Sequence, residues 1–378
     1  MLWGPMETTV IKLNAADIDL SKVKEAALLV DGGALAAFPT ETVYGIACRV
    51  EGDSLKRLSK LKGRDAGKYY TLHIGQRGEV DRYVPAIGLR ARKLIEKVWP
   101  GPLTIVFELS TEQMERQRGA LGAALFENLY SDNSIGIRCP DDAIALALLG
   151  QTSRPVVAPS ANLSGQGPAV DGEEVLRRFG GKIELLLDGG PCRYKQSSTV
   201  VKIGKGALQI LREGVYSRGE LAALSEVHIL FVCTGNSCRS PMAEGIFRKY
   251  LAEKLGCAVD RLGEMGYKVI SAGTLRVTGL PPSAGALAAC AAKGIDIRAH
   301  KSRALSKQVI DGSDLIFTMD RAHRRSVLGL CPEAASKCEL LAGSEDIGDP
   351  MGQPRAVYDN CADIIETAVQ KRIGELAV

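Results

Sequence analysis

The chain has 378 residues, of which 46% are hydrophobic and 24% are charged, and its formal net charge at pH 7 is +4. A chain of this length is expected to form two or three domains, and its apolar content is sufficient for ordinary globular cores. The weak positive charge permits anionic partners such as nucleotides or RNA but does not require them.

Membrane-spanning and secreted classes are excluded by other features of the sequence. No apolar stretch reaches the ~18 residues that span a bilayer, and the N-terminal MLWGPMETTV lacks the apolar core of a secretory signal. The ten cysteines are scattered and include no C-x-x-C pair, which indicates reduced thiols rather than a disulfide framework. We therefore expect a cytoplasmic protein without a membrane partner.

Strand-like and helical stretches alternate along the chain, which predicts an α/β fold. In the first part, the expected strands are residues 34–39, 103–109, 134–139, 155–160, 183–190, 198–203 and 207–214. The expected helices there are residues 21–32, 53–63, 89–99 and 171–181. In the last part, the expected strands are 227–233, 268–273 and 314–320, and the expected helices are 240–256, 283–294 and 361–376.

The best candidate for a domain boundary is the segment VYSRGELAALSE, residues 215–226. It follows the turn residues 212–214, is polar or small in character, and precedes a strand that starts a new α/β series. We predict two domains, residues 1–222 and 223–378, with a short joint between them.

Seven short motifs mark the first domain. They are AFPTETVYGIACRV (37–50), KGRDAGK (62–68), WPGPLT (99–104), GIRCP (136–140), APSANLSG (158–165), SSTVV (197–201) and REG (212–214). Each alone is an ordinary turn or surface pattern. Together and in this order they resemble the YrdC/Sua5 family of threonylcarbamoyl-adenylate synthases, over residues 17–219.

The resemblance implies a YrdC-like twisted mixed sheet whose open basic face binds a nucleotide. It implies a reaction that joins L-threonine, bicarbonate and ATP into threonylcarbamoyl-AMP and pyrophosphate, with Mg²⁺ accompanying ATP. The product is the donor for a modified adenosine (t6A) beside the anticodon of tRNAs. The expected partners are therefore the three substrates, the tRNA-modification machinery and RNA.

The resemblance also implies residues for two of the substrates. ATP would contact Lys62, Arg64, Lys68, Ala158, Ser160, Asn162 and Arg212. L-Threonine would contact Thr42, His73, Arg138 and Ser198. Basic side chains suit a triphosphate and the charge that develops as pyrophosphate leaves, and Arg138 suits a carboxylate because a guanidinium can donate two parallel hydrogen bonds.

The sequence departs from the family pattern at one motif. The family reads K-x-R-P-x-x-[NK]-P-L-x-x-H, whereas KGRDAGKYYTLH has Asp65, Tyr69 and Tyr70 in place of two prolines and a leucine. The cationic positions and His73 are kept, but the prolines that stiffen the loop are lost. The alternative is therefore an RNA-binding or nucleotide-binding module without synthase activity, which would bind RNA with a steep salt dependence.

A thiol at the end of an apolar strand marks the second domain. In VCTGNSCRSP, residues 232–241, Cys233 ends the strand and Ser240-Pro241 is a good helix start. A loop between a strand and a helix N-terminus gathers backbone N–H groups that bind anions, and the same dipoles should lower the pKa of the Cys233 thiol. Arg239 can add a two-pronged contact to phosphate oxygens. The loop is therefore predicted to bind phosphate next to a nucleophile.

This loop, with SAGT (271–274), FTMD (317–320) and DP (349–350) in order, resembles the low-molecular-weight protein phosphatases over residues 227–376. The resemblance implies a Rossmann-like four-stranded parallel sheet flanked by helices. It implies Cys233 as nucleophile, Arg239 as phosphate clamp, Ser240 as donor to the thiolate and Asp349 as general acid, with no metal. The remaining loop residues would be Thr234, Gly235, Asn236, Ser237 and Cys238, with Asn236 holding the loop's shape and Cys238 able to close a reversible disulfide with Cys233.

Two positions bear on the phosphoprotein substrate. Eukaryotic tyrosine-specific members of the family have a bulky aliphatic residue in the loop and aromatic residues directly after the DP pair. Here these positions are Ser237 and Met351. The loop resembles that of the bacterial arginine-phosphatase branch, CTGNTCRSP. We predict a phosphatase of phosphoarginine in proteins, with phosphotyrosine as the alternative.

Overall fold

The computed structural model describes residues 7–63 and 70–377. The predicted ATP contacts at Arg64 and Lys68, and the departures at Asp65 and Tyr69, therefore lie outside the described residues.

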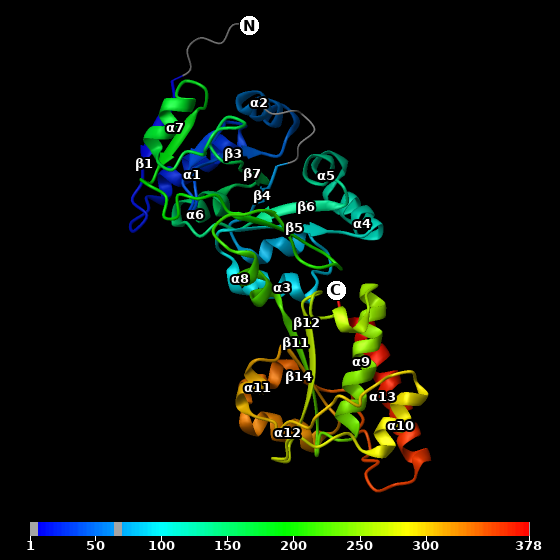
Figure 1. The fold of residues 1–378 in the computed structure, drawn as a ribbon. Helices are drawn as coiled ribbons and strands as arrows, with labels where there is room; N and C mark the ends of the chain where they lie inside the picture. The colour runs from blue at the N-terminus through cyan, green and yellow to red at the C-terminus, as the bar shows by residue number, and fades with distance from the viewer. Residues whose placement is uncertain (1–6, 64–69, 378) are drawn as a thin grey trace. The chain divides into compact units, whose positions relative to one another are not determined.

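The chain divides into two compact units, both of which are α/β (Figure 1). The first unit runs to Gly204 and takes in Leu208–Leu224, and the second takes in Lys205–Ala207 and the chain from Ser225 onward. The predicted fold class, a mixed-sheet unit followed by a parallel four-stranded unit, is confirmed by the sheets described below.

The first unit is built on a mixed sheet. Its strands are β1 (Thr9–Lys12), β2 (Ala36–Phe38), β3 (Gly45–Arg49), β4 (Leu72–His73), β5 (Leu103–Glu108), β6 (Ser134–Arg138), β7 (Val156–Val157), β8 (Leu185–Asp188), β9 (Thr199–Ile203) and β10 (Gln209–Arg212). Its helices are α1 (Leu20–Asp31), α2 (Gly52–Lys62), α3 (Leu89–Val98), α4 (Thr111–Leu121), α5 (Ala123–Leu129), α6 (Ala143–Gln151), α7 (Gly172–Phe179) and α8 (Arg218–Ser225). Within the described residues the strand order is β1-β8-β2-β3-β7-β4-β6-β5-β9-β10, with parallel and antiparallel pairs.

Successive residues of the central strands pack into different cores on the two faces of this sheet. Leu185 and Leu187 of β8 join one cluster, and Leu186 joins the other. The same alternation separates Ala47 from Ile46 in β3. Helices α1 and α6 contribute to the first cluster, whereas α3 and α7 contribute to the second. A period of two is what a strand buried on both faces imposes.

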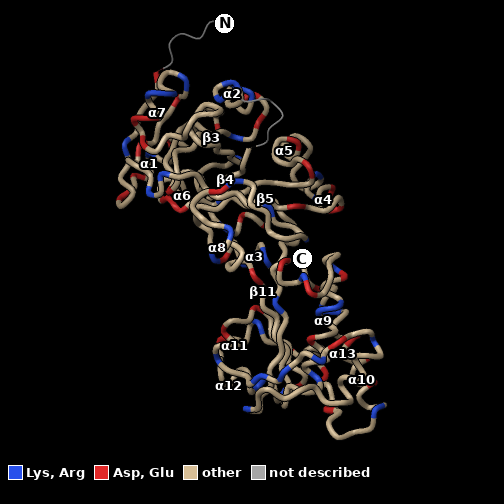
Figure 2. Tube along the Cα trace, in the orientation of Figure 1, with Lys and Arg blue, Asp and Glu red and all other residues tan. Residues whose placement is uncertain are grey.

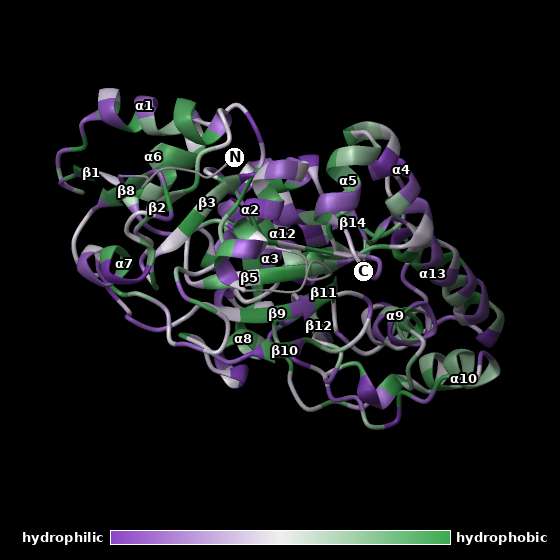
Figure 3. Ribbon diagram, turned by 90° about the horizontal axis from the view of Figure 1, so that it is seen from above, coloured by the Kyte–Doolittle hydropathy of each residue, from purple (hydrophilic) through white to green (hydrophobic). Residues whose placement is uncertain are grey.

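The helices differ in how much of their surface is apolar. Helix α6 is hydrophobic along most of its length (Figure 3), and it buries Ile144, Ala145, Leu148 and Leu149. Helix α7 carries both charge signs (Figure 2), with Glu173, Glu174, Arg177 and Arg178 beside its buried residues. Of these two helices, only α7 shows the amphipathic period that predicts a helix from sequence.

The segment predicted to be a joint is largely helical. Helix α8 fills most of it, and Leu221 is buried in the larger core of the first unit. Ser217 and Glu220 cap its start reciprocally: the Glu220 carboxylate accepts from the Ser217 N–H, and the Ser217 hydroxyl accepts from the Glu220 N–H. This S-x-x-E capping box is a sequence signal for a helix start, and it was overlooked in a stretch of small and polar residues.

The second unit is built on a parallel sheet. Its strands are β11 (Val227–Cys233), β12 (Tyr267–Gly273), β13 (Leu315–Thr318) and β14 (Cys338–Leu340), in the order β12-β11-β13-β14. Its helices are α9 (Arg239–Leu255), α10 (Ala284–Ala292), α11 (Lys307–Asp311), α12 (Arg321–Leu330) and α13 (Arg355–Glu375). All its strand pairs are parallel, and α9, α10 and α13 lie on one side of the sheet with α11 and α12 on the other (Figure 1).

Strand β11 lies in the middle of this sheet and places Cys233 at its carboxyl end, the edge at which open parallel sheets bind ligands. On one face of the sheet Phe231 packs against Phe247 and Phe317. Within residues 7–63 and 70–377, no helix combines the length and the apolar character needed to cross a bilayer.

We expect Leu221→Ala to lower the free energy of unfolding of the first unit by about 2–5 kcal/mol, because it leaves a cavity under α8. The change is measured by urea unfolding, with the exchange of backbone amide hydrogens in β5 and β6 as the signal for the first unit. Leu211→Ala is the matched control, since Leu211 in β10 is 54% exposed. Equal midpoints for the two variants would show that α8 adds nothing to this core.

Candidate active sites

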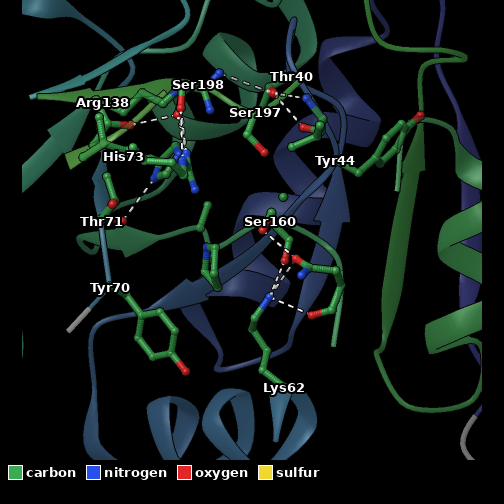
Figure 4. Close-up of a pocket in the computed structure, with 18 of the residues that line it drawn as sticks. Thr40, Tyr44, Lys62, Tyr70, Thr71, His73, Arg138, Ser160, Ser197 and Ser198 are labelled. Atoms are coloured by element: carbon green, nitrogen blue, oxygen red, sulfur yellow. Dashed lines mark hydrogen bonds between the residues drawn. The ribbon is translucent and has the colours of Figure 1, made fainter. Parts of the chain in front are cut away.

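A cleft of about 340 Å³ lies in the first unit where β4, β6, β7 and β10 end (Figure 4). Its wall includes eight of the residues predicted to bind substrates: Lys62, His73, Arg138, Ala158, Ser160, Asn162, Ser198 and Arg212. The predicted threonine residues His73, Arg138 and Ser198 lie at one end, and the predicted ATP residues Lys62 and Ser160 lie at the other (Figure 4).

Arg138, at the end of β6, is buried and only partly paired. Its Nη2 donates to Glu41 Oε1 (2.8 Å) and to Thr42 Oγ1 (2.7 Å). This places the predicted residue Thr42 behind Arg138 rather than in the cleft wall. The Nε atom of Arg138 is buried and has no hydrogen-bond partner among the described residues. A buried donor without a partner is costly, and Arg138 lines the cleft, so this N–H is suited to a ligand.

Glu41 is a buried partner of Arg138 that sequence reasoning missed. Its side chain is 1% exposed, pairs with Arg138, and accepts from the Asp141 N–H (3.1 Å). A buried carboxylate without a cation would be strongly destabilised. The signal was present in the TET motif, where an acid lies between two buried threonines, but nothing in the spacing reveals its distant partner.

His73, at the end of β4, is held as a neutral imidazole. Its Nδ1 lies 3.1 Å from the Thr71 carbonyl oxygen, which can only accept, so Nδ1 carries the proton and Nε2 is an acceptor. Burial, with a smaller contribution from the charge of Arg138, lowers the pKa of His73 to about 3. His73 therefore does not gain a proton at neutral pH.

Lys62 ties helix α2 to the loop after β7. Its Nζ donates to the Ser160 carbonyl oxygen and to two oxygens of Asn162, at 2.8 and 3.3 Å. An ammonium group has three protons to donate, and these three oxygens match them. Lys62 is thus arranged to shape the 158–165 loop.

Arg212 lies at the threonine end of the cleft, apart from most of the predicted ATP residues. It donates to the Ser198 carbonyl oxygen (2.8 Å) and to Ser198 Oγ (3.0 Å). Burial and the nearby charge of Arg138 lower the pKa of Arg212. Among the described lining residues, Lys62, Arg138 and Arg212 are cationic and no carboxylate is present, so the wall favours an anion.

Tyr70 replaces the leucine of the family pattern and becomes part of the cleft wall. It is nearly buried, and its hydroxyl lies 3.1 Å from Ser59 Oγ of helix α2. Across residues 7–63 and 70–377, no group of three His, Cys, Asp or Glu side chains is placed to hold a metal ion.

In the second unit, the loop from β11 to α9 wraps around the Cys233 thiol. Ser240 Oγ lies 2.9 Å from Sγ, and the Asn236 N–H donates to Sγ (3.3 Å). Burial raises the pKa of Cys233, while these hydrogen bonds and the charge of Arg239 act in the opposite direction. The expectation of a lowered pKa is therefore wrong in its net direction, because loss of solvent costs the thiolate more than the loop dipoles return.

Asn236 braces this loop from inside. Its backbone has a φ of +53°, a left-handed conformation that asparagine tolerates better than most residues. Its side-chain amide donates to Ser240 Oγ (2.9 Å) and Ser271 Oγ (2.8 Å), and its Oδ1 accepts from the Arg303 N–H (2.7 Å). The side chain thus connects the thiol's partner to β12 and to the chain beyond it.

The SAGT motif leaves room for the loop. Strand β12 ends at Gly273, where a Cβ atom would lie 2.7 Å from the Thr234 carbonyl oxygen and 3.0 Å from the Asn236 nitrogen. Both are backbone atoms of the phosphate loop, so a side chain at Gly273 would displace the loop itself.

Arg239 is 4% exposed and is held by several acceptors. Nη2 donates to Asp349 Oδ2 (2.6 Å) and Thr234 Oγ1 (3.1 Å), while Nη1 donates to Asp320 Oδ2 (3.2 Å) and the Ile347 carbonyl oxygen (3.0 Å). The structure thus brings the predicted residues Arg239 and Asp349 together. Asp320, the last residue of the FTMD motif, is an additional partner of Arg239 that the sequence did not assign to the site.

Cys238 lies on the outer side of the same loop. Its thiol donates to Ser283 Oγ (3.1 Å) and approaches Met351 Sδ (4.0 Å). Both Cys233 and Cys238 are free thiols here. Ser237 is nearly buried, with Oγ 3.8 Å from Cys238 Sγ, and Met351 is 52% exposed.

We expect Ser240→Ala to raise the pKa of Cys233 further, because it removes a hydrogen bond that stabilises the thiolate. The thiolate fraction at pH 7 then falls, and alkylation by iodoacetamide should slow roughly 10-fold. Mass spectrometry of the Cys233 peptide over time, from pH 6 to 10, measures this rate. Ser326→Ala on the exposed face of α12 is the control, and an unchanged profile in Ser240→Ala would contradict the expectation.

Comparison with known proteins covers both units. The model of the Sua5/YciO/YrdC family, described as telomere recombination, matches residues 28–214, and that of low molecular weight phosphotyrosine protein phosphatase matches residues 228–377. Threonylcarbamoyl-AMP synthase of Mus musculus is 32% identical over 54% of this chain and 71% of its own length. The synthase of Pyrococcus abyssi is 32% identical over 61% of this chain and 65% of its own length.

The chain spans 65% and 58% of the curated P. abyssi and Bacillus subtilis synthases. The crystal structure of P. abyssi Sua5 complexed with L-threonine is 23% identical, covers 70% of this chain and 92% of its own, and has a TM-score of 0.50, which shows a shared fold. The cleft of the first unit and the thiol loop of the second lie within the two matched regions. The chain therefore belongs to the Sua5/YrdC family and carries, after that family's domain, a domain of the low-molecular-weight protein phosphatase family.

Proposed function

We propose that the first unit makes L-threonylcarbamoyl-adenylate from L-threonine, bicarbonate and ATP, for the modification of tRNA. The observation that carries this proposal is the unpaired Nε of Arg138, buried at the end of an acid-free cleft. Nη2 is held by Glu41 and Thr42, so the Nε N–H is the donor of the guanidinium left for a small carboxylate. The family membership and the names of the relatives support the identity of that carboxylate as threonine.

The two ends of the cleft would bind different substrates, threonine at one end and the nucleotide at the other. Arg138 would hold the threonine carboxylate, and neutral His73, with Nε2 as acceptor, would orient the threonine hydroxyl or amine. Ser160 and Asn162, held by Lys62, would contact the nucleotide. Arg212, beside Ser198, would stabilise negative charge where the carbamate meets the α-phosphate and pyrophosphate leaves. Mg²⁺ would supply charge neutralisation on the phosphates.

The purified chain should release pyrophosphate only when Mg·ATP, L-threonine and bicarbonate are all present. Arg138→Lys should raise the KM for threonine roughly 10-fold or more, because a lysine cannot keep the contacts to Glu41 and Thr42 and also supply the Nε donor. Arg177→Lys on α7, 69% exposed, is the matched control. Coupled pyrophosphate detection with each substrate omitted in turn makes the measurement.

A chain with an active second unit that releases no pyrophosphate would refute the synthase. Such a chain would fit the RNA-binding or nucleotide-binding module instead.

We propose further that the second unit removes phosphate from proteins through a phosphocysteine. The carrying observation is Cys233 at the base of a loop that also holds Ser240 and the buried Arg239, with Asp349 at its mouth. Cys233 Sγ would attack phosphorus while Asp349 protonates the leaving group, and water activated by Asp349 would then release phosphate. The loop N–H groups and Arg239 would hold the phosphoryl oxygens throughout.

Asp349 contacts Arg239 in this structure, and its side chain is 44% exposed. An incoming phosphate would take over the Nη2 edge of Arg239 and leave the carboxylate facing the leaving group. Arg239 would thereby bind the phosphate, and Asp349 would then transfer the proton.

We propose phosphoarginine as the substrate, because the loop carries the small, hydroxylic Ser237 and the half-exposed Met351 follows Asp349 and Pro350. The ratio of kcat/KM for a phosphoarginine peptide to that for the matched phosphotyrosine peptide should exceed one. Ser237→Ile should reduce this ratio roughly 10-fold, through loss of the hydroxyl and narrowing of the site. Ser237→Thr is the conservative control and should keep the preference. A wild-type preference for phosphotyrosine would refute this substrate and leave the phosphatase intact.

A further inference from the structure

One buried histidine in the second unit is not used by the proposed mechanism. His323 lies in the first turn of α12 and is 4% exposed. Its Nε2 lies 2.8 Å from Thr234 Oγ1 in the phosphate loop, and its Nδ1 lies 2.9 Å from Asp320 Oδ1. No part of the loop sequence indicates this contact, because the two residues are far apart in the chain.

The chemistry of these groups assigns a direction to each contact. Asp320 Oδ1 already accepts from the His323 N–H as the helix cap. The nearby Nδ1 is not aligned for a second hydrogen bond to this carboxylate, but the negative charge favours the tautomer with its proton on Nδ1. Nε2 is then an acceptor for the Thr234 hydroxyl proton, and the oxygen of that hydroxyl accepts from Arg239 Nη2 (3.1 Å).

Asp320 completes a closed ring of four side chains. Its Oδ2 accepts from Arg239 Nη1 (3.2 Å), so the guanidinium is held on one nitrogen by a carboxylate and on the other by an oriented hydroxyl. Burial lowers the pKa of His323, against the effect of Asp320, and Arg239 lowers it further while Asp349 and Asp346 raise it. The neutral imidazole is the form that can accept from Thr234.

We propose that His323 is a positioning residue of the phosphatase site, which orients the Thr234 hydroxyl and thereby fixes the plane of the Arg239 guanidinium that receives phosphate. This inference rests on the proposed phosphatase function. Without the imidazole, the Thr234 hydroxyl is free to rotate and Nη2 loses a fixed acceptor. The two-pronged contact of Arg239 with phosphate depends on that orientation.

Substitution of His323 by glutamine or by asparagine distinguishes the role of Nε2 from that of Nδ1. In His323→Gln the longer side chain can present an amide oxygen near the position of Nε2, whereas in His323→Asn the amide reaches only the position of Nδ1. The Kd for inorganic phosphate and the KM for p-nitrophenyl phosphate should rise roughly 10-fold in His323→Asn. Both should stay near the wild-type values in His323→Gln, and kcat should change much less than KM in either variant.

A double-substitution cycle tests whether the effect passes through Thr234. His323→Asn should add little to Thr234→Val, since the hydroxyl that it orients is already absent. Equal losses of phosphate affinity in His323→Asn and His323→Gln would indicate a packing role and overturn the proposal. Full additivity with Thr234→Val, or a fall in kcat with an unchanged KM, would overturn it as well.

Phosphate binding is measured by titration calorimetry on the full chain and needs no turnover. A wild-type chain that binds phosphate but hydrolyses neither p-nitrophenyl phosphate nor a phosphoarginine peptide refutes the proposed function, while the contrast between Asn and Gln in the binding constants still decides the role of His323. Thermal unfolding of each variant shows whether a loss of affinity accompanies a loss of fold.

Discussion

A guanidinium removed from water has to be paired with a carboxylate, and both candidate sites are built around that requirement. In the first unit the pair is Arg138 with Glu41, and in the second it is Arg239 with Asp320 and Asp349. The remaining groups at each site are mostly hydroxyls, amides and backbone N–H groups, which cost less to bury once they are hydrogen-bonded.

The two pairs differ in how far the carboxylate is removed from solvent. The Glu41 side chain is 1% exposed, so its pairing with Arg138 Nη2 persists and the Nε N–H is left for a ligand. The Asp349 side chain is 44% exposed, and it can leave Arg239 at little cost in desolvation. One cation therefore presents a fixed surface, whereas the other exchanges its partner during the proposed reaction.

Residue chemistry alone predicted the parts of this protein in which neighbours in the chain are also neighbours in space, whereas distant pairs such as Arg239 with Asp349 followed only from the family resemblance. The thiol loop is one such part, because Cys233, Asn236, Arg239 and Ser240 meet within a single turn. Glu41 and His323 were missed, since Arg138 and Thr234 lie 97 and 89 residues away from them and no local pattern connects these pairs. Helix α6 was missed for a different reason: it is apolar on every side and shows no helical period.

Gly273 sets a limit on how the phosphatase site can change. Because a side chain there would meet backbone atoms of the loop at 2.7 and 3.0 Å, the frame around Cys233 admits almost no variation from this direction. Met351 at the mouth is half-exposed and carries no such restriction. Substitutions at the rim can therefore alter which phosphorylated residue the proposed site accepts without disturbing the frame that holds Cys233.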